Sequence, residues 1–199
     1  MKSAMKRHLR ESGGGVVSSQ VSVPKDRAWL LGQNKADWAG RMMMNGKTYG
    51  TVSPERQKAM SGLEFVQGLA NGALPLNTIA QTLDYDIVEA ETGRVVITVV
   101  PNGSHLNPWG TVHGGLTATL LDSCMGLAVQ STLAKGVSST TLEFKISLVR
   151  AITPETGEIR AEGKVLNAGR RIGTAEGHVI DKMGRLLAHG TTTCFIFES

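Results

Sequence analysis

Apolar residues recur at every second position in six segments of the chain from residue 84 onward, and one long apolar segment interrupts them. A period of two is typical of strands that bury one face. Tight turns such as Thr92-Gly93 and Lys182-Met183-Gly184 separate some of these segments, so the strands that they join must run antiparallel. The segments are 84–91, 94–101, 141–149, 159–165, 171–180 and 185–197.

The interrupting segment, residues 113–133, has the length of a helix and carries apolar residues nearly all around it. Such a distribution predicts a helix that is buried on most sides. The order is therefore strand, strand, helix and four strands. We expect an α+β fold in which an antiparallel sheet wraps around the long helix.

The residues before this domain follow a different pattern. Residues 1–52 show no clean period, and we interpret them as a poorly ordered extension or one that drapes over the domain. Ser53, Pro54 and Glu55 are typical of the first turn of a helix, which we expect to run to about residue 72. A short helix is expected near 75–82. The predicted division is 1–52 extension, 53–83 N-terminal helices and 84–199 main domain.

Composition narrows the function classes. The chain has 199 residues, 41% apolar and 19% charged, with a net charge of +4. Its apolar runs, such as Val95–Val100, are far shorter than the roughly 20 residues that a membrane span needs. Aromatic residues make up 5% and do not alternate with basic ones, which argues against nucleic acid as a partner.

The two cysteines, Cys124 and Cys194, lie in apolar contexts, and no secretory signal precedes them. We therefore expect a reducing, cytoplasmic location and no disulfide. His105, His178 and His189 look isolated, and neither they nor the cysteines have the spacing of a metal site. No metal and no cofactor is expected.

The segment from Asn107 to Gly115 is the most informative loop. Gly114 and Gly115 open the long helix although glycine is a poor helix former. Glycines there let a ligand approach the free N–H groups at the positive end of the helix. The alternative is a tight junction between loop and helix.

Asp122 is a carboxylate within an otherwise apolar stretch of the same helix. Burying an ionised carboxylate is costly unless it is paired or hydrogen-bonded. It can serve as a general base or nucleophile, or it can be a structural acid that hydroxyls such as those of Thr119 and Ser123 satisfy. Together with N–H groups and the Asn107 amide, which can stabilise an oxyanion, Asp122 indicates acyl transfer or hydrolysis.

Helix geometry limits how these groups can cooperate. Gly114 and Asp122 are eight residues apart, which is about 12 Å at 1.5 Å per residue. That is too far for both to act on one carbonyl within one chain. If both act on the same bond they must come from two subunits, so we expect at least a dimer with two equivalent sites.

At these residues the sequence resembles the hotdog-fold thioesterases, specifically the phenylacetic-acid-degradation (PaaI-type) branch. The resemblance covers Leu63 to Phe197. It depends on Asn107, Gly110, His113, Gly114 and Gly115 at their spacing, on Asp122, and on the strand 140–145. It implies hydrolysis of an aryl- or medium-chain acyl-CoA without a metal or prosthetic group, by a homodimer or a homotetramer.

The resemblance also implies roles for single residues. Asn107 and the Gly114 N–H would bind the thioester oxygen, and His113 would support that loop. Asp122 of the neighbouring subunit would be general base or nucleophile. Thr141 would place the water, unless the strand turns Thr140 toward the site instead.

Further residues would bind the coenzyme A part of the substrate. Gly115 is a candidate, and so are Arg170 and Arg171, which follow Gly169 at a predicted hairpin; arginine suits phosphate recognition. A solvated turn is the alternative for the two arginines.

Two other functions are open on this sequence. A related hydratase or dehydratase would share the fold, but residues 105–110 lack the Asp and the His of its loop. A non-catalytic acyl-CoA-binding module would keep the pocket without needing Asp122.

Overall fold

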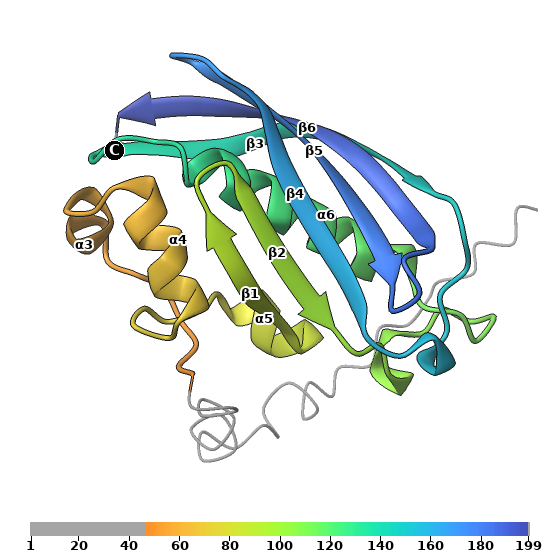
Figure 1. The fold of residues 1–199 in the computed structure, drawn as a ribbon. Helices are drawn as coiled ribbons and strands as arrows, with labels where there is room; N and C mark the ends of the chain where they lie inside the picture. The colour runs from red at the N-terminus through yellow and green to blue at the C-terminus, as the bar shows by residue number, and fades with distance from the viewer. Residues whose placement is uncertain (1–46, 199) are drawn as a thin grey trace, which may run out of the picture.

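An antiparallel sheet wraps around one central helix in the computed structural model, which describes residues 47–198 (Figure 1). Helix α6 (Gly114–Gln130) follows the first two strands and leads to a third at the opposite edge. The α+β prediction is confirmed. Within the described residues the sheet has the order β1-β2-β4-β5-β6-β3, formed by β1 (Tyr85–Glu91), β2 (Arg94–Val99), β3 (Val137–Leu148), β4 (Ile159–Ala168), β5 (Ile172–Asp181) and β6 (Leu186–Glu198).

Three helices precede the sheet: α3 (Pro54–Lys58), α4 (Gly62–Ala70) and α5 (Thr78–Leu83). The prediction of one helix from residue 53 to about 72 is wrong, because a second helix start lies inside it. The Ser61 hydroxyl accepts from the Glu64 N–H, and the Glu64 carboxylate accepts from the Ser61 N–H at 2.8 Å. This capping box begins α4 anew.

The strand predictions are confirmed with small shifts of their ends. The largest shift is in β3, which begins at Val137 rather than 141. The Gln130 side chain at the end of α6 explains it, because its amide donates to the Val137 carbonyl and its oxygen accepts from the Ser139 N–H. The end of the helix thereby aligns the start of the strand. Two short 3₁₀ helices, Gly103–His105 and Pro154–Thr156, lie in the loops.

Helix and sheet approach each other closely where glycines replace side chains on the inner face. A Cβ at Gly163 of β4 would lie 2.4 Å from the carbonyl carbon and oxygen of Cys124 in α6. A Cβ at Gly177 of β5 would lie 2.9 Å from the Met125 Cγ. Neither position has room for a side chain, so these glycines set the distance between helix and sheet.

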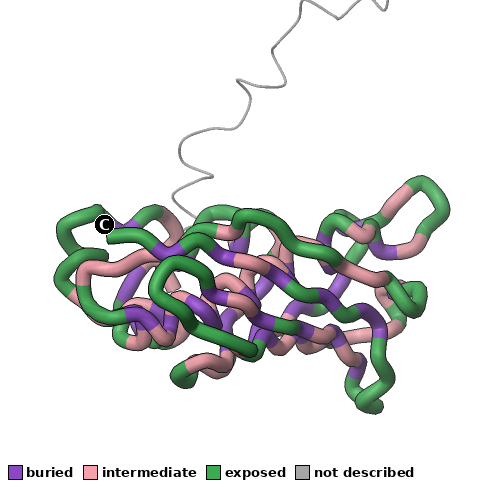
Figure 2. The backbone as a smooth tube through the Cα atoms, turned by 90° about the horizontal axis from the view of Figure 1, so that it is seen from above, coloured by how far each residue is buried: buried purple, intermediate pink, exposed green. Residues whose placement is uncertain are grey.

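Buried residues lie mainly in the interior of the molecule, and exposed ones mainly in its outer strands and loops (Figure 2). The buried residues of α6 lie on the side that faces the sheet. Only Gly115 of the helix is exposed, so the expectation that the helix is buried on most sides is confirmed. A stripe on the other side, formed by Gly115, Thr119, Asp122, Ser123 and Gly126, is only partly covered or is exposed. The buried residues of α6 are Leu116, Thr117, Leu120, Leu121, Cys124, Met125, Ala128 and Val129.

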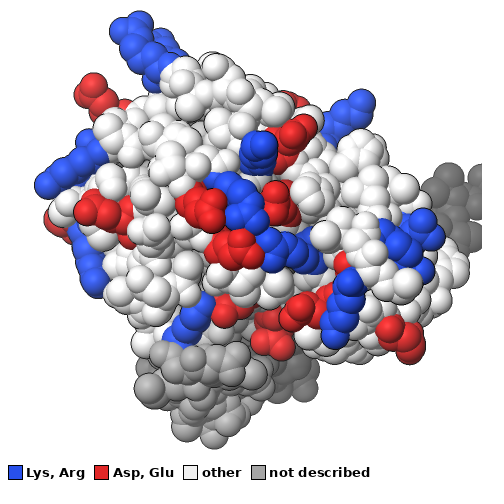
Figure 3. All heavy atoms as spheres, in the orientation of Figure 1, with Lys and Arg blue, Asp and Glu red and all other residues white. Residues whose placement is uncertain are grey.

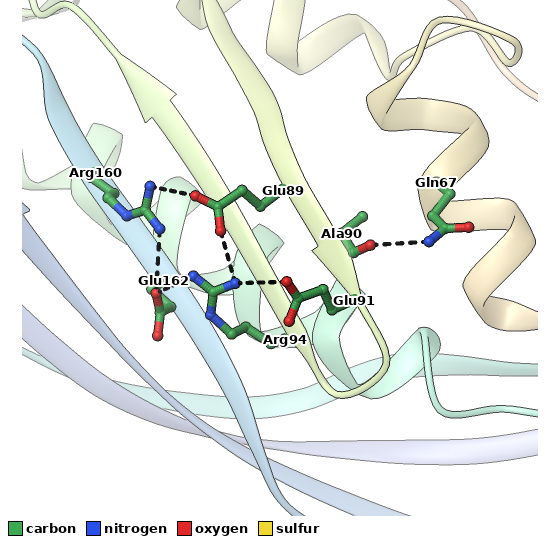
Figure 4. A network of polar contacts seen from close by, with 7 residues as sticks. All are labelled: Gln67, Glu89, Ala90, Glu91, Arg94, Arg160 and Glu162. Atoms are coloured by element: carbon green, nitrogen blue, oxygen red, sulfur yellow. Dashed lines mark hydrogen bonds and ion pairs between the residues drawn. The ribbon is translucent and has the colours of Figure 1, made fainter.

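Charged side chains gather on the outer face of β1, β2 and β4 (Figures 3 and 4). Arg94 pairs with Glu89 at 2.8 Å and with Glu162 at 2.9 Å, and Arg160 pairs with Glu89 at 2.7 Å. Hydrogen bonds from Arg160 and Arg94 lower the pKa of Glu89. Val96 lies opposite both Glu89 and Glu162 and is fully buried, so the ion pairs cover an apolar side chain on the solvent face.

The last residues of the predicted extension pack on the domain. Lys47 pairs with Asp86, the Gly50 N–H donates to the Leu76 carbonyl at 2.8 Å, and Val52 is buried. Residues 1–46, which form most of that predicted extension, lie outside the described residues. The Gln67 amide of α4 donates to the Ala90 carbonyl of β1 (Figure 4). No helix in residues 47–198 has the length and apolar character to cross a membrane.

Substituting Gly163 by alanine tests the close approach of helix and sheet. Because the new Cβ would meet backbone atoms of α6, we expect the free energy of unfolding to fall by about 1–3 kcal/mol. Urea unfolding measures it. The matched control is Gly103→Ala, since a Cβ at Gly103 has nothing within 4 Å and should change stability by less than about 0.5 kcal/mol. Equal stability of the two variants would contradict the packing argument.

Candidate active site

Asp122 lies on the uncovered stripe of α6, and its neighbour Thr141 binds it. The Thr141 hydroxyl donates to Asp122 Oδ1 at 2.9 Å. Pairing in the sheet shows why Thr141 and not Thr140 does so. Thr141 lies opposite the buried Cys194 and faces the helix, whereas Thr140 lies opposite the exposed Phe195. The structure therefore favours Thr141 over Thr140 as the partner of the acid.

The expected structural partners of Asp122 are engaged elsewhere. The Thr119 hydroxyl donates to the Gly115 carbonyl at 3.0 Å. The Ser123 hydroxyl lies 3.2 Å from the Tyr85 hydroxyl, which also bonds Asn77 Oδ1 at 3.1 Å. Because an amide oxygen only accepts, Tyr85 donates to Asn77 and Ser123 donates to Tyr85. The alternative of a structural acid named Thr119 and Ser123 as examples of hydroxyls that satisfy Asp122; the hydroxyl that bonds Asp122 is instead that of Thr141.

The network of Ser123, Tyr85 and Asn77 was not predicted from the sequence. Tyr85 is buried, and this burial raises the pKa of its phenol, with the charge of Asp122 acting in the same direction. Tyr85 and Ser123 are 38 residues apart, so no local pattern joins them. The network fixes the helix turn that carries Asp122 against β1 and α5.

Asp122 opens into a cavity of about 750 Å³. Most of its walls come from three parts of the fold: α3 and α4 with the residues between them, the second half of α6, and the first half of β3. Asn77 and, from β6, Cys194 and Phe197 complete the lining. Apolar side chains of Met60, Phe65 and Leu127 line it together with Thr141. A carboxylate with one bonded hydroxyl beside a partly open, partly apolar space is suited to activating water next to a bound acyl group.

The loop from Asn107 to His113 lies at the other end of α6. The Asn107 oxygen accepts from the N–H groups of Trp109 at 2.9 Å and Thr111 at 3.3 Å, and its amide donates to the Thr111 hydroxyl at 2.7 Å. An amide nitrogen carries two hydrogens, so one remains for a ligand. Asn107 thus both braces the loop and keeps a donor.

His113 is the N-cap of α6. Its Nδ1 accepts from the Gly115 N–H at 2.8 Å, which places the proton of the neutral ring on Nε2. A Cβ at Gly115 would lie 2.8 Å from that Nδ1, so only glycine leaves the ring where it is. The Gly115 N–H is consumed by this bond. Gly114 is the first residue of the helix, where the N–H has no partner within a helix.

These two groups of residues are not brought together within one chain. Asn107, His113, Gly114 and Gly115 do not line the cavity that holds Asp122. Gly114 and Asp122 remain eight residues apart on one continuous helix, about 12 Å along its axis. Because the helix between Gly114 and Asp122 is unbroken, the structure keeps the separation that the sequence predicts for them.

The other predicted candidates lie away from the cavity. Arg170 and Arg171 occupy the exposed turn between β4 and β5. His178 and His189 lie opposite each other on β5 and β6, so the description of them as isolated is wrong. His105 is buried, and its Nδ1 accepts from the Asn102 N–H. Among residues 47–198 no cluster of three or more His, Cys, Asp or Glu side chains could hold a metal ion.

Both cysteines are free thiols that are fully buried. Burial raises the pKa of Cys124 and of Cys194, which keeps both protonated. Neither is therefore an activated nucleophile.

Comparison with known proteins agrees with this architecture. Residues 110–188 match the thioesterase superfamily. Human acyl-coenzyme A thioesterase 13 is 30% identical over 109 residues, which cover 54% of this chain and 76% of that protein. The chain belongs to the thioesterase superfamily. Its sheet wrapped around α6 is the hotdog fold, as the resemblance implied, and membership makes it an enzyme of the thioesterase class.

Other relatives of this thioesterase extend the comparison. An esterase of Halobacterium salinarum is 40% identical over 73 residues, 36% of this chain and 46% of that protein, so the match spans less than half of that relative. A phenylacetic acid degradation-related protein of Ralstonia eutropha superposes with a TM-score of 0.60 at 28% identity, over 66% of this chain and 98% of its own. A Streptococcus pneumoniae thioesterase solved with coenzyme A superposes with a TM-score of 0.53 at 28% identity, over 58% of this chain and 90% of its own.

Replacing Thr141 tests its bond to Asp122. Thr141→Val keeps the shape and removes the hydroxyl, so we expect thioester hydrolysis to fall about 10- to 100-fold, the value of a hydrogen bond to a charged group. Thr141→Ser keeps the hydroxyl and should restore most of the rate. The measurement is kcat for the best thioester substrate. If the valine variant is as fast as the serine variant, the Thr141 hydroxyl has no part in the hydrolysis.

Proposed function

We propose that this thioesterase hydrolyses acyl-CoA to the free acid and coenzyme A. The observation that carries the proposal is the Asp122 carboxylate, held by Thr141 and open to the cavity. Two relatives support coenzyme A as the thiol: the human protein named for acyl-coenzyme A and the S. pneumoniae structure with coenzyme A.

In the proposed reaction Asp122 acts on water as a general base. Thr141 donates to one carboxylate oxygen, which leaves the other oxygen to take a proton from water. The hydroxide forms a bond to the thioester carbon, the carbonyl electrons move to oxygen, and on collapse the carbon–sulfur bond breaks. The thiolate of coenzyme A then takes the proton that Asp122 holds. Direct attack by Asp122 is the alternative, and it would pass through an anhydride.

The oxyanion would be held by the other protomer. The Gly114 N–H at the positive end of α6 and the remaining Asn107 amide hydrogen would donate to it. His113 positions this loop through its bond to Gly115. Because about 12 Å of helix separates Gly114 from Asp122, two copies of the chain are needed to complete one site.

Strand β3 is suited to joining two copies. It is twelve residues long and lies at the edge of the sheet, paired with β6 on one side only. Leu142, Phe144 and Leu148 on or near this edge are 59%, 40% and 56% exposed. Long exposed apolar edges are normally covered. We propose that β3 pairs with β3 of a second copy, giving a homodimer that can associate further into a homotetramer.

The coenzyme A part of the bound substrate would extend from the site along the protein surface. Arg170 and Arg171 in the exposed β4–β5 turn are proposed to contact its phosphates, since arginine suits phosphate recognition. Gly115 would let coenzyme A approach the backbone closely. Its N–H would not bind the coenzyme, because it already donates to His113. In this proposal residues 84–199 form the thioesterase domain and residues 53–83 its helical cover.

The replacement Asp122→Asn tests the base. We expect kcat to fall about 10²- to 10⁴-fold with KM nearly unchanged, because the amide cannot accept a proton from water. Release of the coenzyme A thiol, followed with a colour reagent, measures the rate. A variant with the wild-type rate would refute the assignment. Binding of acyl-CoA by the wild type without thiol release would instead favour the non-catalytic module.

Mixed dimers test the shared site. Gly114→Pro removes the N–H at the first helical position, where proline is well tolerated, and His113 already has the extended backbone (φ −63°, ψ 132°) that proline requires. We expect this variant and Asp122→Asn each to be nearly inactive. Randomly mixed dimers should regain about a quarter of wild-type activity, because half the dimers carry one intact site.

Gly114→Ala is the control for the proline variant, since it keeps the N–H and introduces the same Cβ near the Leu148 side chain. It should retain activity. If mixing the two inactive variants restores nothing while size-exclusion shows that mixed dimers form, each site lies within one chain and the proposed dimer mechanism fails.

A further inference from the structure

The cavity continues along α6 beyond Asp122. Besides Asp122 and Ser123, three further residues of the helix line it: Gly126, Leu127 and Gln130. Asp122 and Gln130 are eight residues apart, so this part of the cavity is about 12 Å long. One end carries the carboxylate that would act on the thioester, and the other end is the C-terminus of the helix.

Gly126 forms the floor midway along this space. A Cβ at Gly126 would meet only the Thr141 hydroxyl, at an ordinary 3.6 Å. The fold therefore does not require glycine there, unlike Gly163, where a Cβ would meet backbone. Glycine in a helix interior costs stability relative to alanine. What it provides at residue 126 is an open path for a ligand along the helix.

At the far end lies the elbow formed by the residues between α3 and α4 and the first turn of α4, residues 59–65. Gly62 docks this elbow on the end of α6, because a Cβ there would lie 1.7 Å from the Gln130 carbonyl oxygen and its N–H donates to the Leu133 carbonyl at 2.9 Å. The capping box at Ser61 fixes the turn. Met60 and Phe65 are thereby held at the Gln130 end, partly packed on the core and partly lining the cavity.

We propose that this elbow limits the length of the acyl group, with Gly126 as the floor and Met60 and Phe65 as the end wall. The inference rests on the proposed function and names its substrate class, a straight medium-length acyl chain. An extended chain advances about 1.2 Å per bond, so about 12 Å, less the space of the side chains that close the end, holds on the order of eight carbons.

The test is a series of straight-chain substrates, from acetyl-CoA through hexanoyl-, octanoyl- and decanoyl- to dodecanoyl-CoA. For the wild type, kcat/KM should rise about three- to fourfold per buried methylene up to about octanoyl-CoA and then fall. Met60→Ala and Phe65→Ala should each move the maximum to chains about two carbons longer, because the shortened side chain frees a few ångströms. Gly126→Leu should move it to chains at least two carbons shorter.

Met183→Ala is the matched control for Met60→Ala. Met183 lies in the β5–β6 turn, is 78% exposed, and does not line the cavity, so its replacement should leave the chain-length profile unchanged. Gly126→Ala provides the same test if the leucine variant does not fold. It should raise the midpoint of thermal unfolding by about 2–4 °C while still lowering the ratio of dodecanoyl- to acetyl-CoA hydrolysis.

The outcomes separate the two proposals. If the wild type hydrolyses none of these substrates, nor an aryl-CoA, the proposed function fails. If it hydrolyses them but the elbow and Gly126 variants keep the wild-type profile, the acyl chain lies elsewhere and only the present inference fails. It also fails if Gly126→Leu changes the oligomeric state by size-exclusion and leaves the profile as it was, because another copy of the chain then fills the space.

Discussion

The close packing of α6 against the sheet is the constraint from which the rest of the structure follows. Gly163 and Gly177 remove side chains at the contact, so the helix backbone comes close to β4 and β5. One side of the helix is therefore buried in the core. Asp122 lies away from this contact, on the side of the helix that borders the cavity.

The open side of α6 is then divided between two tasks. Its first turn presents N–H groups beside a loop that Asn107 and His113 brace internally. Its middle presents Asp122, which β3 meets through Thr141. Both halves are rigidly built, yet the helix that joins them keeps them apart. The shape of the single chain thus favours an assembly in which one helix start faces the middle of another.

Much of the fold could be predicted because its signals are local. Alternation marked the strands, and the length of segment 113–133 marked the central helix. Asp122 was identifiable because a carboxylate among Leu121, Cys124 and Met125 requires an explanation. The same local reasoning failed between α3 and α4, where a capping box of Ser61 and Glu64 begins a second helix inside what the sequence pattern presents as one helix.

The remaining features depend on contacts between distant residues. Whether Thr140 or Thr141 meets the helix is set by the pairing of β3 with β6 up to a bulge after Thr141. Tyr85, Ser123 and Asn77 join across three elements. Nothing in the residues around Met60 and Phe65 indicates a cavity, because their role comes from where Gly62 docks. Sequence could therefore name the acid but not the walls of its pocket.

The burial of both thiols has a consequence for how the protein withstands oxidants. Peroxides and disulfides attack the thiolate, and both Cys124 and Cys194 are held in the protonated form away from solvent. An enzyme whose product is itself a free thiol works where mixed disulfides form readily. With both thiols buried, this chain is poorly susceptible to forming a mixed disulfide with the coenzyme that the proposed reaction would release.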